Sequence, residues 1–132
     1  PYQHDAVVLQ PTEVCSLPVT VVNILSRDNP ALHRELFNRW QRALQEADAW
    51  ITELSTGSAR QRVARLLLRL VRDSEPSACE LFSREDMGAM LAITTETASR
   101  TIAEFKRQSL LVETASNRFL LDVPNLHRIA EE

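Results

Sequence analysis

The chain has 132 residues, of which 44% are hydrophobic and 25% charged, and its formal net charge is −3. This length fits one ordinary domain or two small ones, and the composition allows a packed core and excludes a disordered chain. No apolar run is long enough to span a membrane. The acidic balance counts mildly against nucleic-acid binding, but the acidic excess lies before residue 58, and DNA affinity depends on local phosphate contacts.

Residues 1–22 are rich in Val and Leu and are interrupted by Pro11 and Pro18. The pattern predicts short strands at Ala6 to Leu9 and at Val14 to Leu17. Two strands alone do not make a stable sheet. The chain also begins at Pro1 without an initiator Met, so we expect a fragment of a longer protein.

A long helix is predicted from Asn29-Pro30 to Leu54, because Asn is a good N-cap, Pro a good first residue, and Ser55-Thr56-Gly57 a good stop. It has about 26 residues and a length of about 39 Å. Its apolar residues repeat every 3.5 positions, as in a coiled coil: Leu36, Trp40, Ala43, Ala47, Trp50 and Leu54. Phe37, Leu44 and Ile51 widen this face. We expect the helix to form a dimer interface; the alternative is the core helix of a monomeric bundle.

A second helix is predicted from Ser58 to Arg72, with apolar residues at helical spacing. Arginines occupy much of the remaining surface: Arg60, Arg62, Arg65, Arg69 and Arg72. Such a row can contact phosphates, but it is more often a solvated face.

Two short helices with a tight turn follow, which predicts a helix-turn-helix. Ser83 and Asp86 resemble a capping box before the helix Arg84 to Leu91, and Thr94 caps a helix from Thr95 to about Gln108. The predicted shared core is Met87, Leu91, Ile93, Ala98, Ile102 and Phe105. The small residues Gly88 and Ala89 allow the helices to approach closely.

Polar residues crowd the start of the second of these helices, where a helix-turn-helix meets base edges: Thr94, Thr95, Glu96, Thr97, Ser99 and Arg100. Glu96, Ser99 and Arg100 share one face. An Arg can bind guanine O6 and N7, and a Glu can accept from cytosine N4. The alternative is an exposed Glu–Arg pair that stabilises the helix by about 0.2–0.5 kcal/mol. Thr and Ser are mediocre helix formers, which favours DNA contacts.

A strand, a turn and a second strand are predicted at Leu110 to Thr114, Ala115 to Asn117 and Arg118 to Asp122. A hairpin after a helix-turn-helix forms a wing, and Asn117 or Arg118 at its tip could reach a phosphate. Pro124 to Ala130 predicts a last turn of helix.

The stretch from Phe82 to Phe105 resembles the winged helix of the Crp/Fnr regulators, and the long helix resembles their dimer helix. Residues 1–22, especially Ala6-Val-Val-Leu and Glu13-Val-Cys-Ser-Leu-Pro, resemble the last strands of their cyclic-nucleotide-type β-roll. The resemblance therefore covers essentially the whole chain. It implies a mainly α fold with a small β part: a β-roll remnant (1–28), a dimerisation helix (29–56) and a winged helix-turn-helix (57–132).

The Glu96-x-x-Ser99-Arg100 motif is similar to the recognition signature of the Fnr branch, which reads palindromes with TTGAT-like half-sites. The resemblance implies a cytoplasmic homodimeric transcription regulator that binds double-stranded DNA and, as a partner, RNA polymerase. The expected DNA-binding residues are Ser83, Arg84, Thr94, Thr95, Glu96, Thr97, Ser99, Arg100 and Arg118.

Two positions depart from the family pattern. Ala92 stands in the turn where members often have Gly, which costs about 1–2 kcal/mol if the backbone there is left-handed. Thr95 stands where Crp has Arg, which disfavours a Crp-like operator.

Cys15 resembles the single distal cluster cysteine of oxygen-sensing Fnr proteins, but a [4Fe–4S] cluster needs four thiolates and the chain has two cysteines. Cys15 and Cys79 otherwise fit small buried hydrophobes in a reducing cytoplasm. We expect no cofactor in this fragment, and the effector of the sensor region stays unknown.

Two other functions are alternatives to this one. A helical protein-interaction module would use the same surface without base readout, and substitution of Arg100 would distinguish it. An enzyme is disfavoured, because His4, His33 and His127 are scattered and the chain has only two glycines.

Overall fold

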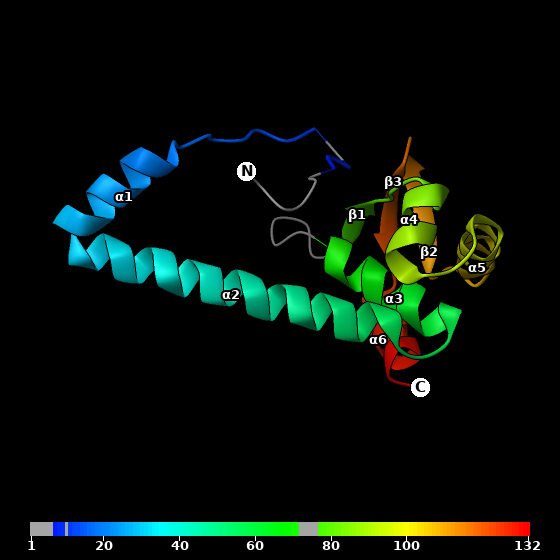
Figure 1. The fold of residues 1–132 in the computed structure, drawn as a ribbon. Helices are drawn as coiled ribbons and strands as arrows, with labels where there is room; N and C mark the ends of the chain where they lie inside the picture. Colours follow the sequence, from blue (N-terminus) through cyan, green and yellow to red (C-terminus); the bar gives the residue numbers. More distant parts are fainter. Residues whose placement is uncertain (1–6, 10, 72–76) are drawn as a thin grey trace. The chain divides into compact units, whose positions relative to one another are not determined.

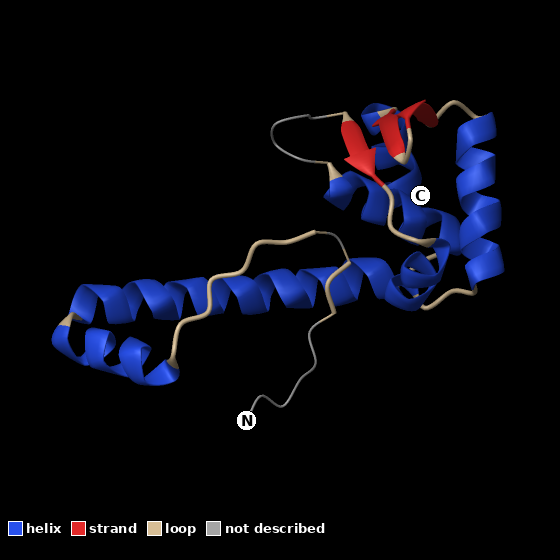
Figure 2. Ribbon diagram, turned by 90° about the horizontal axis from the view of Figure 1, so that it is seen from above, coloured by secondary structure: helices blue, strands red, loops and turns tan. Residues whose placement is uncertain are grey.

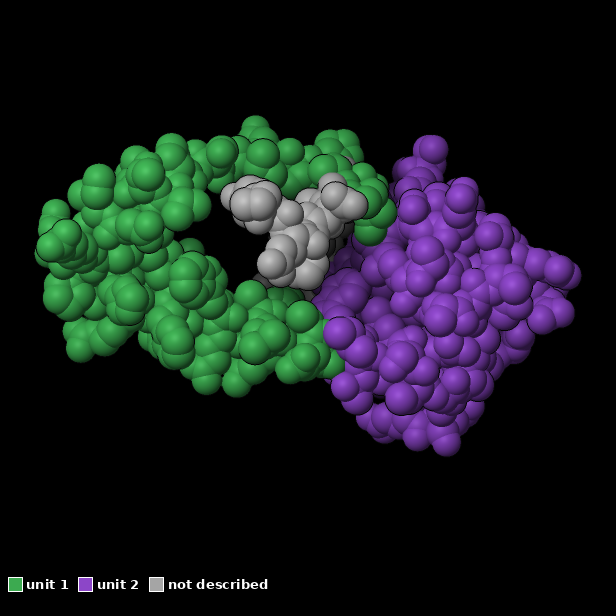
Figure 3. Space-filling view, in the orientation of Figure 1, with its two compact units in different colours: residues 1–49 green, residues 50–132 purple. Residues whose placement is uncertain are grey.

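The computed structural model describes residues 7–9, 11–71 and 77–132. The chain divides into two compact units, Pro1–Ala49 and Trp50–Glu132 (Figure 3). The helices and strands follow one another as shown in Figure 1: α1 (Val19–Asp28), α2 (Pro30–Ser55), α3 (Ala59–Leu70), β1 (Ala78–Glu80), α4 (Arg84–Leu91), α5 (Thr95–Arg107), β2 (Leu111–Ala115), β3 (Arg118–Leu121) and α6 (Val123–Glu131). The mainly α fold with a small sheet is confirmed. No described helix is both long and apolar enough to cross a lipid bilayer.

The first unit contains α1 and most of α2. The predicted start of α2 is confirmed, because Asn29 Oδ1 accepts hydrogen bonds from the backbone N–H groups of Ala31 and Leu32 at 3.1 and 3.2 Å. The helix ends at Ser55, and Gly57 then takes a positive φ of 85° that favours glycine. The long helix therefore has the bounds that its end signals indicated.

The strands predicted near the N-terminus are not formed in the described residues. Residues 7–9 and 11–18 have no strand, residues 19–28 form helix α1, and Ala6 lies outside the described residues. A strand needs neighbours that satisfy its backbone hydrogen bonds, and no described strand of the chain pairs with these residues. Val-rich sequence favours a strand mainly where a sheet surface is present to pack against.

The second unit is built on α3, whose buried face lies in the core. The most completely buried large side chains are Phe105, Leu66, Leu67, Met87, Leu91, Ile102, Leu126 and Val63. The core predicted for the helix-turn-helix is confirmed, with Ile93 only partly buried at its edge. The three strands lie side by side in the order β1-β3-β2, all antiparallel (Figure 2). Phe119 and Leu121 alternate with exposed residues along β3 and face the core.

Arginines of α3 bind the ends of other helices. Arg65 donates from Nε and Nη2 to Ala130 O at 3.0 and 2.8 Å, and from Nη1 to Glu53 O and Thr56 O at 3.0 and 2.9 Å. The last carbonyls of a helix lack intrahelical donors, so Arg65 completes the ends of α2 and α6. Each such charge-assisted bond contributes about 1.5–3 kcal/mol.

Arg69 pairs with the Glu53 carboxylate at 2.7 Å and lies 5.2 Å from the centre of the Trp50 ring. The described arginines of α3 are therefore mainly structural. They do not form a simply solvated face, a phosphate contact from them stays a prediction, and Arg72 lies outside the described residues.

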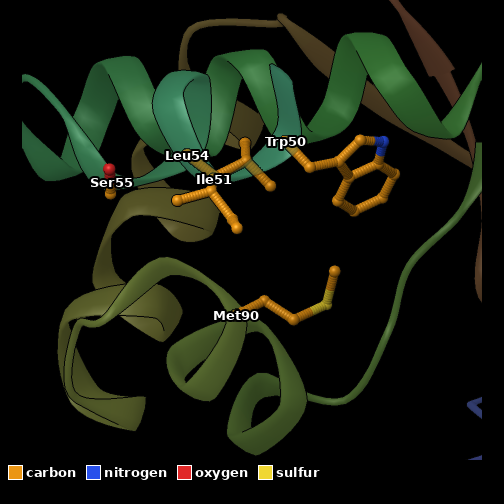
Figure 4. A pocket seen from close by; sticks show the side chains of 5 residues that line it. All are labelled: Trp50, Ile51, Leu54, Ser55 and Met90. Atoms are coloured by element: carbon orange, nitrogen blue, oxygen red, sulfur yellow. The ribbon is translucent and has the colours of Figure 1, made fainter. Parts of the chain in front are cut away.

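A small apolar pocket lies between the end of α2 and α4, both within the second unit (Figure 4). Its volume is about 280 Å³, and Trp50, Ile51 and Leu54 face Met90 across it, with Ser55 at the edge. Leu54 is only 4% exposed, so this member of the predicted dimer seam belongs to the core of its own chain.

Candidate nucleic-acid interface

Helix α4 begins where the sequence predicted. Ser83 Oγ accepts a hydrogen bond from Asp86 N at 3.0 Å, and the Ser83 hydroxyl donates to Asp86 Oδ2 at 2.6 Å. The Ser83 side chain is exposed but is used by this cap. A phosphate contact from Ser83 would therefore have to share its hydroxyl with the helix end.

The turn between α4 and α5 is left-handed at Ala92, with φ 49° and ψ 47°. Ile93 N donates to Gly88 O at 3.0 Å, which closes the turn. A Cβ on Gly88 would lie 2.9 Å from Ile93 O, so only glycine fits there without a shift of the backbone. One tight turn thus accounts both for the small residue at position 88 and for the conformational cost expected at Ala92.

Helix α5 is capped by Thr94, whose Oγ1 accepts from Thr97 N at 3.1 Å. The hydroxyls of Thr94 and Thr97 also lie 2.9 Å apart and hydrogen-bond each other. These two threonines are therefore partly occupied in starting the helix. Their role in the cap accounts for some of the polar residues at the start of α5, which were predicted to contact DNA.

Four further residues at the start of α5 form what we call the reading face: Thr95, Glu96, Ser99 and Arg100. All four side chains are exposed. In the part of the chain that the structure describes, Glu96 and Arg100 have no ion pair with each other or with any other residue. The structure does not form the Glu–Arg pair of the alternative interpretation, so these groups are available for an external partner.

Two arginines of α3 contact the helix-turn-helix. Arg62 Nη1 donates to Leu91 O at 2.5 Å, and its Nε is buried without a hydrogen-bond partner. Arg60 binds the Glu104 carboxylate and, through Nη2, Gln108 Oε1 at 2.9 Å; its guanidinium lies 5.2 Å from the Phe105 ring centre. These contacts were not predicted, because no local spacing indicates which carbonyl or carboxylate an arginine will reach.

The wing is the hairpin β2–β3, with a register shift between Glu113 and Ala115. Asn117 takes a φ of 57° in its turn, and its side-chain amide donates to Leu81 O at 2.9 Å. This hydrogen bond anchors the wing to the segment before α4, and a phosphate contact of Asn117 stays a prediction. Arg118 is exposed at the first position of β3, and its DNA contact stays a prediction.

Arg84 is half-buried, with Nη1 3.4 Å from Met87 Sδ. Burial lowers the pKa of Arg84, and the nearby Glu113 carboxylate opposes that shift. Because an arginine starts from so high a pKa, the guanidinium stays charged at neutral pH. Arg84 keeps a positive charge beside the wing.

Lys106 on α5 binds Glu113 on β2 at 2.8 Å and lies over the Phe119 ring at 4.6 Å from its centre. The hydrogen bond from Lys106 holds the pKa of the Glu113 carboxyl below its usual range. This contact joins the last turn of α5 to the wing, so the elements on both sides of the interface are tied together.

The two cysteines differ in their surroundings. Cys15 is exposed, whereas Cys79 on β1 is buried, and burial raises the pKa of its thiol to about 11. Cys79 is therefore a neutral core residue at physiological pH, as expected. Within the described residues, no group of three or more His, Cys, Asp or Glu is arranged to hold a metal ion.

Comparison with known proteins gives consistent matches. Residues 61–130 match the Crp-like helix-turn-helix domain family. The chain is 27% identical over 135 residues to the transcriptional activator protein anr of Pseudomonas aeruginosa, covering 98% of this chain and 55% of that protein. It is 32% identical over 109 residues to the transcriptional regulator LdrP of Thermus thermophilus, covering 78% of this chain and 55% of that protein. The chain thus spans about half the length of the curated relatives it matches.

Solved structures show the same fold. FixK2 from Bradyrhizobium japonicum matches with a TM-score of 0.74 and 25% identity, over 83% of this chain and 57% of that one. TTHB099 of Thermus thermophilus, a transcriptional regulator of the CRP family, matches with a TM-score of 0.63 and 30% identity, over 79% of this chain and 55% of that one.

Proposed function

Because the chain belongs to the Crp/Fnr family of transcription regulators, we propose that it binds a palindromic operator as a homodimer and reads each half-site through Glu96, Ser99 and Arg100. Members of this family regulate transcription and are not enzymes. The half-site is TTGAT-like, by the similarity of the Glu96-x-x-Ser99-Arg100 motif to the Fnr branch.

The exposed, unpaired state of Glu96 and Arg100 carries this proposal. A free guanidinium can give two hydrogen bonds to guanine, and a free carboxylate can accept from cytosine N4. Both stand in the first turns of α5, which is the part of a recognition helix that meets base edges. Thr95, Ser83, Arg84, Thr94, Thr97 and Arg118 would add contacts to bases or phosphates around them.

The dimer would form along α2. Its exposed large apolar residues are Phe37, Trp40, Leu44 and Ile51, at 59%, 67%, 64% and 67% exposure. Their spacings of three, four and seven residues follow a coiled-coil seam, with Ala47 at the intermediate position. This row differs from the seam expected from the sequence, because Leu54 is buried in its own chain. Leu36 and Trp50 are partly buried, and Ala43 is exposed beside the row.

The assignment of residues 1–28 to the end of a sensor β-roll, of 29–56 to the dimerisation helix and of 57–132 to the DNA-binding domain is part of the same proposal. The signal would then act on sequence outside this chain. A cytoplasmic location and contact with RNA polymerase follow from the proposed role in transcription.

The substitution Arg100→Gln tests base readout directly. We expect the affinity for a TTGAT-type palindrome to fall by about 1–3 kcal/mol and the preference over a scrambled duplex to shrink. Thermal stability should not change, because Arg100 is exposed and makes no ion pair in the described structure.

Arg107→Gln is the matched control, since Arg107 is an exposed arginine at the opposite end of the same helix. It should weaken binding to both duplexes alike or not at all. Unchanged binding by the Arg100 variant would favour the protein-interaction module instead.

A further inference from the structure

The carbonyl of Leu91, the last residue of α4, receives a hydrogen bond from a neighbouring helix. Arg62 Nη1 on α3 donates to it at 2.5 Å. The final carbonyls of a helix have no intrahelical donor. The backbone N–H of Ile93 in this turn donates to Gly88 O, not to Leu91 O. The Arg62 guanidinium therefore supplies the donor for Leu91 O.

This carbonyl belongs to the peptide plane between Leu91 and Ala92. Rotation about φ of Ala92 turns that plane relative to the residues that follow, and with it the direction in which α5 leaves the turn. Ala92 holds a φ of 49°, in a region where an L residue with a Cβ is disfavoured. The hydrogen bond from Arg62 to Leu91 O, which fixes this peptide plane, therefore helps to hold Ala92 at a positive φ that alanine disfavours.

The far end of α5 is held by the same helix. Arg60, two residues before Arg62, binds Glu104 and Gln108 and covers the Phe105 ring. Neither arginine lies on the reading face. Helix α3 thus contacts the turn before α5 and the last turn of α5. The four residues of the reading face stay exposed between these two points.

We propose that Arg62, with Arg60, is a positioning residue that sets the orientation of α5 and thereby the base preference of the reading face. The effect on base preference rests on the proposed DNA-binding function, whereas the effect on helix orientation does not.

The buried Nε of Arg62 makes the proposal testable apart from stability. This N–H has no partner in the structure, so Arg62→Met removes one unsatisfied donor together with the bond to Leu91. Methionine keeps the unbranched stem and most of its packing volume. The variant should fold, while the Leu91–Ala92 peptide plane loses its constraint.

The experiment compares the 132-residue protein with its Arg62→Met and Arg69→Met variants. Arg69 is a matched control: it lies on the same helix, but its ion pair and ring contact go to Glu53 and Trp50. Amide residual dipolar couplings report the orientation of α5 relative to α3 without DNA. Fluorescence anisotropy then gives the ratio of affinities for a TTGAT-type palindrome and a scrambled duplex.

We expect Arg62→Met to change the couplings of α5 relative to those of α3 and to lower the affinity ratio about fivefold or more, the smallest discrimination that one aligned bidentate contact supplies. Arg69→Met should change neither. Adding Ala92→Gly to Arg62→Met should restore the ratio in part, since glycine takes the left-handed conformation without strain.

Unchanged α5 couplings in a folded Arg62→Met variant would overturn the proposal, whatever the DNA result. Changed couplings with an unchanged affinity ratio would overturn its link to base preference. If the unsubstituted protein showed no preference for the palindrome, the proposed function would fail, while the couplings would still decide whether Arg62 positions the helix.

Discussion

At the scale of single residues, the turn at Ala92 shows how a local cost is held in place by its surroundings. The left-handed backbone costs an alanine about 1–2 kcal/mol. The absence of a side chain at Gly88 makes room for the turn, and Arg62 donates a hydrogen bond to Leu91 O beside it. The sequence could predict the conditional cost, because a turn of this length often needs a left-handed residue, but it could not identify the arginine that constrains it.

Ala92→Gly should therefore stabilise the folded chain. Removing the strain gains about 1–2 kcal/mol, and the greater freedom of glycine in the unfolded chain takes back about 0.5–1 kcal/mol. We expect a net rise of roughly 1 kcal/mol in the free energy of unfolding, measured by urea titration. Ala89→Gly, at an exposed position inside α4, is the control and should lower it by up to about 1 kcal/mol. A loss of stability in both variants would contradict the strain at Ala92.

The pH dependence of stability has a residue-scale origin at Glu113. Its pKa is lowered in the folded chain, chiefly by the hydrogen bond from Lys106, so the unfolded chain binds a proton more readily. The contribution is present above the ordinary glutamate pKa of 4.5 and is lost as the pH falls through the lower folded value. In thermal melts between pH 7 and pH 2, the unsubstituted protein should melt at a higher temperature than Glu113→Gln at neutral pH, and this difference should disappear below about pH 4.5.

Glu46→Gln is the control for this series, because Glu46 is exposed and makes no ion pair in the described residues. Its melting temperature should follow that of the unsubstituted protein throughout. A Glu113→Gln curve parallel to both would show that the Lys106 contact does not stabilise the fold.

At the scale of elements, end signals and apolar spacing predicted most of the second unit. Asn29, Ser83 and Thr94 cap α2, α4 and α5 as expected, because a side-chain oxygen beside free N–H groups is a strictly local interaction. The hairpin was also predicted, since two short strand-like segments flank the turn at Ala115 to Asn117.

The missed elements depend on tertiary contacts. Strand β1 has only the residues Ala78–Glu80, too few for a periodic pattern, and exists because it pairs with β3. Helix α1 was missed because its valines favour strands when a sheet is present. Partners distant in sequence decide both cases, and a single sequence does not reveal them.

The seam of α2 makes an element-scale prediction. Leu44 is 64% exposed at the centre of the apolar row, so Leu44→Glu should leave the helix intact while placing an unpaired charge in a dimer interface. We expect the dimer dissociation constant to rise about 100-fold or more in sedimentation equilibrium, corresponding to roughly 3 kcal/mol. Gln45→Glu, one residue away from the row and exposed, should have little effect. Equal dissociation constants for the two variants would place the interface elsewhere.

At the scale of the whole molecule, one helix joins the proposed dimer contact to the DNA-binding unit. Helix α2 runs without interruption from Pro30 to Ser55, and its last residues pack into the core of the second unit. The chain corresponds to about half the length of its relatives, so the part that senses a signal is proposed to lie outside it. Most of the residues that would pair subunits lie in the first unit, whereas Ile51 and the residues that would read DNA lie in the second.

In the proposed function, two chains read a palindrome together. Fluorescence anisotropy of the protein with a TTGAT-type palindromic duplex and with a scrambled duplex, over a series of salt concentrations, tests it most directly. We expect at least about tenfold tighter binding to the palindrome at a stoichiometry of two chains per duplex, with affinity falling as salt rises. Equal affinity for the two duplexes, or no binding by the folded protein at low salt, would contradict it.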